Sequence, residues 1–305
     1  MALDEVLDGE DQAFVGPSLA SYRYDGHIWA LPVDAACQVA VSRPDLMAPL
    51  GEPVPRTWEE MFALARPAAR RGMKLAVAFK GVHGLMTFFT LCANLGGPCG
   101  TEPGEPLFDR AIAREALGAM RRLAGLCPAE ALDWNSIALH DAMAARDDLV
   151  YCPAVYCYAT YAEADARRPL RFHDLPGLAA ADPRGSTIGG TGLGISAYSS
   201  EPEATMSYAR FLLEPATQTQ FAVHHGQPAR LEAWENPDID SRFGHCFSAT
   251  RKTMDGCWIR PRYDGYLAFQ ARGGELVESH LRGDLDETAL LAGLETAWIS
   301  QKGQS

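Results

Sequence analysis

The sequence predicts an α/β protein with helices layered around a mostly parallel sheet. Short strand-like segments alternate with longer helical segments along the chain, and this alternation is typical of such layers. The segment 75–79 (Leu-Ala-Val-Ala-Phe) is apolar at every position, as expected of a strand buried on both faces. We find no internal repeat and no low-complexity tract, so the sequence favours an ordinary globular protein.

The expected strands follow from apolar or alternating runs bounded by turn residues. Residues 34–36 (Asp-Ala-Ala) are expected to form a turn between the first two strands. Residues 187–196 contain four glycines and are expected to be a crossover where the backbone bends or approaches a ligand closely. The expected strands are 27–33, 38–41, 75–79, 149–151 and 170–172.

The expected helices follow from apolar positions spaced three and four residues apart. The clearest start lies at Thr57, whose side chain can cap a helix while Glu60 returns a bond to the Thr57 amide. Residues 227–264 show few clear periodicities. One expected helix begins at residue 57. The others cover residues 85–95, 109–126, 134–146, 202–213, 215–224, 263–272 and 287–298.

Composition and charge exclude several classes of function. The chain has 305 residues, with 39 acidic and 27 basic side chains and a formal net charge of −12. A nucleic-acid-binding protein normally carries a basic patch, so we expect no nucleic-acid partner. The N-terminus is acidic and lacks the basic start and apolar stretch of a secretory signal, and no apolar run reaches the roughly 18–20 residues of a membrane span.

No catalytic or metal-binding motif stands out. The segment 189–194 (Gly-Gly-Thr-Gly-Leu-Gly) has neither the Walker nor the dinucleotide-binding spacing, and the sequence contains no G-x-S-x-G or H-E-x-x-H. His224 and His225 are adjacent, which does not suit a shared metal ion on a helix. The eight cysteines lack zinc-site spacings, and we interpret them as small buried hydrophobic residues, with their pairing left open. We therefore predict no catalytic residue, no metal and no cofactor.

The order of several motifs resembles the extracellular solute-binding proteins of ABC importers, in the carbohydrate-binding branch that includes maltose-binding protein. The motifs are 24–34 (Tyr-Asp-Gly-His-Ile-Trp-Ala-Leu-Pro-Val-Asp), 55–60 (Pro-Arg-Thr-Trp-Glu-Glu), 187–200 with its glycines, 201–212, and 226–228 (Gly-Gln-Pro). No single motif is specific, but the resemblance extends over nearly the whole chain. It implies a two-lobe periplasmic-binding-protein type II fold.

The resemblance also implies how the lobes are divided. The remainder of the N-terminal lobe would comprise 1–36 and 189–255, and the C-terminal lobe 37–188 and 256–305. Family members carry a signal peptide and roughly a hundred further residues before the motif that starts here at Tyr24. We therefore expect one lobe to be incomplete, with exposed apolar surface on its remainder.

The implied function is reversible capture of a small solute, a sugar or polyol, between two lobes, and its delivery to the membrane subunits of an ABC permease. A monomer located in the periplasm or outside the cell is expected. Matching by motif gives a set of ligand-binding candidates in the two crossovers, a helix start and two aromatic segments: Asp34, His83, Met86, Tyr156, Tyr158, Gly190, Thr191, Arg260, Tyr263 and Tyr266.

Two other interpretations stay open. The chain could be a truncated or degenerate solute-binding protein kept in the cytosol without transport activity. It could also be an enzyme on a similar two-lobe scaffold, which requires a nucleophile and a base in one cleft. The sequence does not identify the ligand, because aromatic side chains with Asp34 and Arg260 suit a sugar, a polyol or a small peptide.

Overall fold

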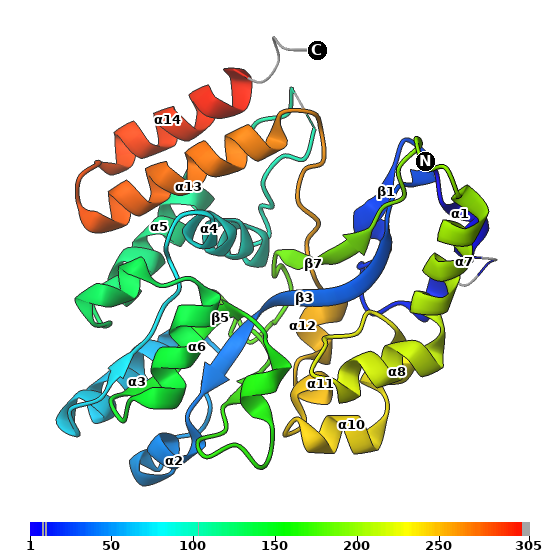
Figure 1. Ribbon diagram of the computed structural model, residues 1–305. Coiled ribbons are helices and arrows are strands. Elements are labelled where there is room, and N and C mark those ends of the chain that lie inside the picture. The colour runs from blue at the N-terminus through cyan, green and yellow to red at the C-terminus, as the bar shows by residue number, and fades with distance from the viewer. Residues whose placement is uncertain (8, 10, 103, 301–305) are drawn as a thin grey trace.

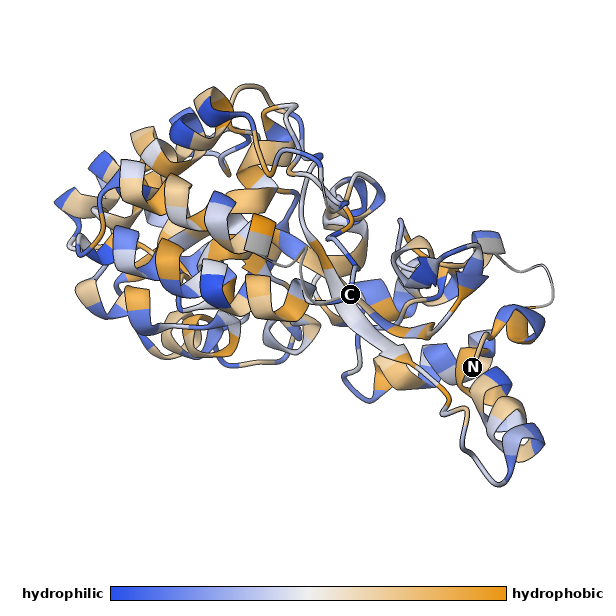
Figure 2. Cartoon of the chain, turned by 90° about the horizontal axis from the view of Figure 1, so that it is seen from above, coloured by the Kyte–Doolittle hydropathy of each residue, from blue (hydrophilic) through white to orange (hydrophobic). Residues whose placement is uncertain are grey.

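The computed structural model describes residues 1–7, 9, 11–102 and 104–300. Two bodies of unequal size are joined by a long strand, as Figure 2 shows from above. In Figure 1 this strand, β3, crosses the centre of the molecule, with the glycine-rich strand β7 beside it. The larger body carries the two C-terminal helices and the smaller one carries the N-terminus.

The strands are mostly short, apart from β3 and β5. They are β1 (Arg23–Tyr24), β2 (His27–Ile28), β3 (Leu31–Ser42), β4 (Lys74–Leu75), β5 (Leu149–Tyr156), β6 (Arg171–His173) and β7 (Ile188–Leu193).

The main sheet has the order β4-β5-β3-β6, and β7 pairs with the first part of β3. The prediction of a mostly parallel sheet is wrong, because β3 runs antiparallel to β5, β6 and β7, and only β4 and β5 are parallel. The reason lies in the connections. A parallel pair needs a helical crossover, which joins β4 to β5, whereas β3 pairs with strands that return in the opposite direction.

The expected turn at residues 34–36 is also wrong, since β3 runs through it without a break. Asp34, Ala35 and Ala36 pair with Thr191, Gly190 and Gly189 of β7. The backbone groups of this short polar interruption therefore find partners about 155 residues further along the chain, which local sequence does not reveal. Register shifts between Pro32 and Asp34 and between Val39 and Val41 mark two bulges in the strand.

The helices predicted up to residue 224 are all present and close to their predicted bounds, whereas the helices of four to six residues were not predicted. The described residues form fourteen α-helices. They are α1 (Asp4–Leu7), α2 (Pro44–Met47), α3 (Trp58–Arg70), α4 (Val82–Asn94), α5 (Arg110–Ala124), α6 (Ser136–Ala145), α7 (Pro202–Leu213), α8 (Pro215–Val223), α9 (Leu231–Trp234), α10 (Pro237–Arg242), α11 (Cys246–Ala249), α12 (Arg251–Asp255), α13 (Tyr266–Arg282) and α14 (Glu287–Ser300).

Side-chain caps set the N-termini of three of these helices. Thr57 and Glu60 form the predicted capping box at α3. Asp109 accepts hydrogen bonds from the first amides of α5, and Asn135 does so for α6. These starts are encoded within a few residues, which is why the sequence predicts them.

Helix α13 extends ten residues beyond its predicted end at Arg272. Two consecutive glycines, Gly273 and Gly274, suggest a stop in the sequence, but they lie inside the helix. A Cβ atom on Gly273 would come within 2.9 Å of the Leu85 side chain, and one on Gly274 within 2.8 Å of the backbone at Gly81. The glycines therefore allow α13 to pack closely against the start of α4.

Two buried apolar clusters lie on opposite faces of the sheet. One lies among α3, α4, α5, α13 and α14, and the other among α1, β3, β5, α7, α8 and the short helices α10–α12. Along β3, Ala40 belongs to the first cluster and its neighbours Val39 and Val41 to the second, as expected from the alternation of side chains along a strand.

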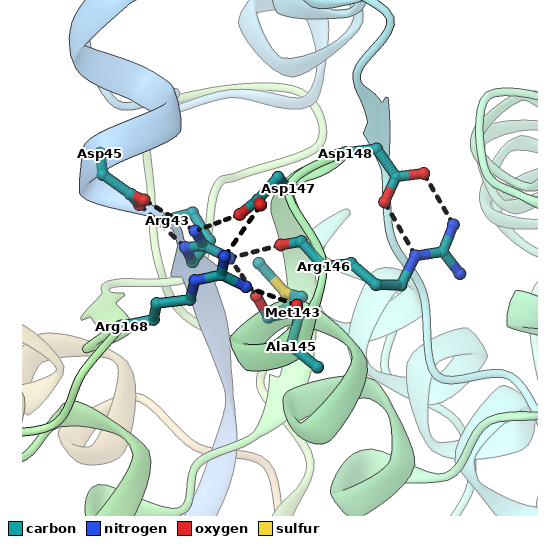
Figure 3. Close-up of polar contacts among 8 residues, drawn as sticks. All are labelled: Arg43, Asp45, Met143, Ala145, Arg146, Asp147, Asp148 and Arg168. Atoms are coloured by element: carbon teal, nitrogen blue, oxygen red, sulfur yellow. Dashed lines mark hydrogen bonds and ion pairs between the residues drawn. The ribbon is translucent and has the colours of Figure 1, made fainter.

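A buried arginine directly follows the C-terminal end of β3. The Arg43 side chain is fully buried and donates hydrogen bonds to both carboxylate oxygens of Asp45 and to the Met143 carbonyl at the end of α6 (Figure 3). Asp147 lies 3.2 Å from the same guanidinium. The strand, α2 and the C-terminus of α6 are thereby held at one point.

Large aromatic side chains are exposed on the smaller body. Tyr198 is 97% exposed, and Tyr208 and Phe211 on α7 stack on each other at the surface. Exposed apolar surface was expected for this part of the chain. No helix in the described ranges combines the length and the apolarity that a membrane span requires.

Candidate ligand-binding site

Two adjoining cavities lie along the pair of strands β3 and β7. One, here called the polar cavity, has a volume of about 450 Å³ and is lined by Asp34, His83, Thr160, Gln227 and Arg260 among others. The second, here called the aromatic cavity, has a volume of about 480 Å³, and its lining includes Tyr22, Tyr24, Trp29, Tyr263 and Tyr266. Both share Gly189, Gly190, Arg260 and Gln270, so they lie side by side, and the two together are called the cleft here.

The structure brings all the predicted ligand-binding candidates to this cleft. Those in the wall of the polar cavity are Asp34, His83, Met86, Tyr156, Tyr158, Gly190, Thr191 and Arg260. Those in the wall of the aromatic cavity are Gly190, Arg260, Tyr263 and Tyr266. They come from β3, α4, β7, the end of β5 with Tyr158 just after it, and the segment from Arg260 to the start of α13 at Tyr266. The sequence order of motifs was therefore a good guide to their convergence.

Two glycines of β7 are required because atoms of neighbouring residues approach them closely. Gly190 has a φ of +109°, which side chains other than hydrogen rarely allow, and a Cβ atom there would lie 2.4 Å from the Asp34 carbonyl oxygen. At Gly189 a Cβ atom would lie 2.7 Å from the Tyr156 ring. The glycine-rich segment thus lets β7 lie against β3 and leaves room for an aromatic ring in the cleft.

Asp34 is the acidic group of the polar cavity. Its burial raises the pKa of its carboxyl to about 6, and a hydrogen bond from the Thr191 amide opposes part of this rise. At neutral pH the Asp34 side chain is therefore a carboxylate in a cavity wall that is partly shielded from water. Such a group accepts hydrogen bonds strongly from hydroxyl groups.

His83 lies in the wall of the same cavity, at the first turn of α4. Its Nδ1 atom lies 3.2 Å from the Ser136 hydroxyl, and its ring meets the Tyr156 ring edge to face. Burial lowers the pKa of His83, so the ring is neutral at pH 7. A neutral imidazole offers one donor and one acceptor. Met86, one turn further, adds a buried apolar surface.

Arg260 links the two cavities. Its Nη1 atom donates a hydrogen bond to Gln270 at 3.0 Å, and the sulfur of Met86 lies 4.0 Å away. The guanidinium is thus oriented by a side chain of α13 while it contributes to both cavity walls. It supplies several donors at a fixed position.

Tyrosines provide much of the remaining surface. The rings of Tyr263 and Tyr266 meet edge to face with centroids 5.9 Å apart, and within the described ranges neither buried hydroxyl has a hydrogen-bond partner. Tyr158 is 40% exposed at the mouth of the polar cavity. Rings with a polar end suit ligands that have both apolar faces and hydroxyl groups.

Sequence reasoning missed several residues of the cleft, namely Tyr22, Tyr24, Trp29, Gln227 and Gln270. Two signals were available. Tyr24 and Trp29 lie within the motif that ends at Asp34, Gln227 lies within the motif 226–228, and Gln270 follows Tyr266 by one helical turn on α13. Tyr22 carries no such signal, because only the fold brings it to the cleft.

One serine–histidine contact bears on the enzyme alternative. The Ser42 hydroxyl lies 2.8 Å from Nε2 of His173, but Ser42 is only 2% exposed. Burial, followed by the positive charge of Arg171, lowers the pKa of His173 to about 4. In a catalytic serine–histidine pair, a carboxylate supports the histidine, whereas the charged neighbour of His173 is Arg171. The contact therefore stabilises the sheet and does not have a catalytic geometry.

Comparisons with known proteins agree with this architecture. A family model of bacterial extracellular solute-binding proteins matches residues 2–242. No curated protein matches the chain.

Three solved structures illustrate the fold. T. maritima MalE3 with bound maltose superposes with a TM-score of 0.83 at 19% identity, over 98% of this chain and 79% of that one. An ABC-transporter solute-binding protein from Agrobacterium radiobacter K84 in complex with ribitol gives 0.80 at 20% identity, over 98% and 76%. The GacH receptor of Streptomyces glaucescens GLA.O, also solved with acarbose, gives 0.80 at 18% identity, over 100% and 79%.

These likenesses establish the periplasmic-binding-protein type II fold, and the family model covers well over half of the chain. The family consists of binding proteins and not of enzymes. We conclude that the chain belongs to the bacterial extracellular solute-binding proteins.

Proposed function

We propose that this protein is the substrate-binding component of an ABC importer and captures a carbohydrate or polyol in the cleft. The observation that carries the proposal is the composition of the cleft. Aromatic faces from Tyr158, Tyr263 and Tyr266 adjoin a carboxylate at Asp34 and a guanidinium at Arg260. Sugar rings have apolar C–H faces and many hydroxyl groups, so they need both kinds of contact.

Solved structures with the same fold support this ligand class. The similar structures named above hold maltose or ribitol, and a related protein from Thermotoga lettingae holds α-D-tagatose.

The proposed mechanism is closure of two lobes around the solute. The lobes would comprise residues 1–36 with 189–255, and 37–188 with 256–305. Asp34 and Thr191 would then contact the ligand from near one lobe, and His83, Tyr158 and Tyr266 from the other. A ligand that contacts both lobes favours the closed state, because only differential affinity shifts such an equilibrium. The closed monomer, outside the cytoplasmic membrane, would deliver the solute to the permease.

Isothermal titration calorimetry with maltose, ribitol, tagatose and a panel of other sugars and polyols tests the proposal. We expect heat of binding with at least one of them, and loss of that heat in Asp34→Ala and Tyr266→Ala. Tyr198→Ala is the matched control, because this tyrosine is almost fully exposed and lies outside the cleft. Absence of binding across the panel by a folded protein would refute a carbohydrate ligand.

A further inference from the structure

Two buried cysteines meet beside the cleft. Cys157 directly follows β5, and Cys246 is the first residue of α11. Their sulfur atoms lie 3.2 Å apart, although 89 positions separate them in sequence. The side chains are only 6% and 1% exposed, respectively.

Little movement is needed for a disulfide bond to form between these two sulfur atoms. A disulfide bond is about 2.05 Å long, so the two sulfur atoms need to approach by about 1 Å. Both thiols border a narrow void with no room for a water molecule, which they share with Cys37, Trp234 and Met254. Side chains at the edge of such a void can shift without displacing solvent.

The chain belongs to an extracellular family, and disulfide bonds form and persist in extracellular compartments. We propose that Cys157 and Cys246 form a disulfide bond when the protein folds in an oxidising environment. Each thiol loses one proton and one electron, and a dithiol-forming oxidant, such as oxidised glutathione or a protein disulfide, is reduced to two thiols as the new S–S bond forms.

The bond has to form before the core closes. Burial raises the pKa of the Cys157 thiol well above its ordinary value, and contact with Cys246 raises it further. The attacking species is the thiolate, so the Cys157 thiol reacts slowly in the native protein and faster in the nascent chain. Once formed, the buried bond is shielded from reductants.

The disulfide bond would also affect the ligand cleft. Cys157 lies between Tyr156 and Tyr158, and all three residues contribute to the wall of the polar cavity. The disulfide would hold this aromatic wall covalently against α11.

Two other pairs of thiols are rivals for oxidation. Cys92 contacts Cys99, and Cys37 contacts Cys257. Cys37 is also adjacent to Cys157, since the Cys157 amide donates a hydrogen bond to the Cys37 carbonyl at 3.2 Å. An experiment must therefore identify which sulfurs are joined, and not only count the free thiols.

Peptide mapping of the full chain does this. The protein is refolded at pH 8 with oxidised and reduced glutathione, its free thiols are blocked, and it is digested without reduction. We expect a cross-linked peptide containing Cys157 and Cys246 that is two hydrogens lighter than the sum of its parts. It should be absent in Cys246→Ser and present in the control Cys127→Ser. Eight free thiols after refolding, or cross-links at the rival pairs alone, would overturn the proposal.

A second measurement does not depend on the variants folding. The oxidised wild-type protein is melted before and after reduction in denaturant and refolding under dithiothreitol. A bond that closes so long a loop should raise the melting temperature, on the order of 5–10 °C for a chain of this size. Equal melting temperatures for the two forms would contradict the bond.

Discussion

The guanidinium of Arg43 binds the two carboxylate oxygens of Asp45 through parallel hydrogen bonds of 2.8 and 2.7 Å. The arginine side chain is fully buried, while Asp45 remains largely exposed. The same guanidinium caps the C-terminus of α6 through the Met143 carbonyl. This single side chain thus joins the end of β3 to two helices (Figure 3).

Replacement of Arg43 by methionine should destabilise the protein by about 2–4 kcal/mol, because buried carbonyl groups lose their donor and Asp45 loses its partner. Urea unfolding at pH 7 measures this. Arg184→Met is the matched control, since Arg184 makes a similar pair with Asp182 at the surface, where ion pairs contribute little. Equal effects of the two substitutions would contradict the role of burial.

Asp34→Asn should stabilise the ligand-free protein above pH 6. The folded-state pKa of Asp34 is about 6, against an ordinary value of 3.8. The folded protein therefore holds this proton more tightly than the unfolded chain, and stability falls as the pH rises from about 4 to 6. The asparagine variant avoids this loss, which is of the order of 1–3 kcal/mol. Melting temperatures of both proteins at pH 4.5 and pH 8 should diverge at the higher pH.

The same substitution should weaken ligand binding. If the Asp34 carboxylate accepts ligand hydroxyls, the wild-type affinity falls below pH 6 as the group is protonated. The asparagine variant should bind weakly at every pH and show no such dependence. Calorimetric titrations between pH 5 and pH 8 with a ligand found in the panel measure this, and a parallel pH profile in the variant would exclude Asp34 as the titrating group.

His140 should make the fold sensitive to acid. It is fully buried, stacks on Tyr161 with ring centroids 4.9 Å apart, and its burial lowers its pKa to about 3. The unfolded chain binds this proton near pH 6.5, so stability is lost as the pH falls from about 6.5 toward 3, by up to about 1.4 kcal/mol per pH unit. His140→Phe should lower the pH dependence of urea unfolding between pH 7 and pH 4, and an unchanged pH dependence in this variant would contradict the role of His140.

Gly190→Ala should disrupt the pairing of β3 with β7. The new methyl group would clash with the Asp34 carbonyl and force an unfavourable positive φ, so we expect a loss of about 2 kcal/mol or more. Gly118→Ala on α5 is the matched control, because nothing lies within 4 Å of that position. The control should be neutral or stabilising by up to about 1 kcal/mol. Circular dichroism melts of the two variants separate these outcomes.

Local signals predicted much of the fold. The capping box at Thr57 and the helix α7 (Pro202–Leu213) depend on neighbouring residues, and both agree with the structure. The continuity of β3 and the length of α13 were missed for the same physical reason. Asp34 finds its strand partner at Thr191, and Gly273 is tolerated because Leu85 packs against it. Such compensation comes from distant parts of the chain.

The candidate site followed from the order of motifs, which brought Asp34 and Tyr266 to one cleft. Gln227 was not predicted as a cleft residue although it lies in the motif 226–228, because the motif marks a position in the chain and not the contacts of the side chain. Its amide nitrogen donates to the Ala35 carbonyl on β3, a contact that only the folded chain creates.

The two bulges in β3 lie on either side of its central span. Between them, the residues from Asp34 to Val39 pair with β7 and then with β5, whereas the ladder is interrupted at the bulges. We expect torsion between the two bodies to concentrate at Pro32–Asp34 and Val39–Val41. A rotation at the first bulge would move the smaller body past the Asp34 carboxylate, while Asp34 kept its position relative to the central span.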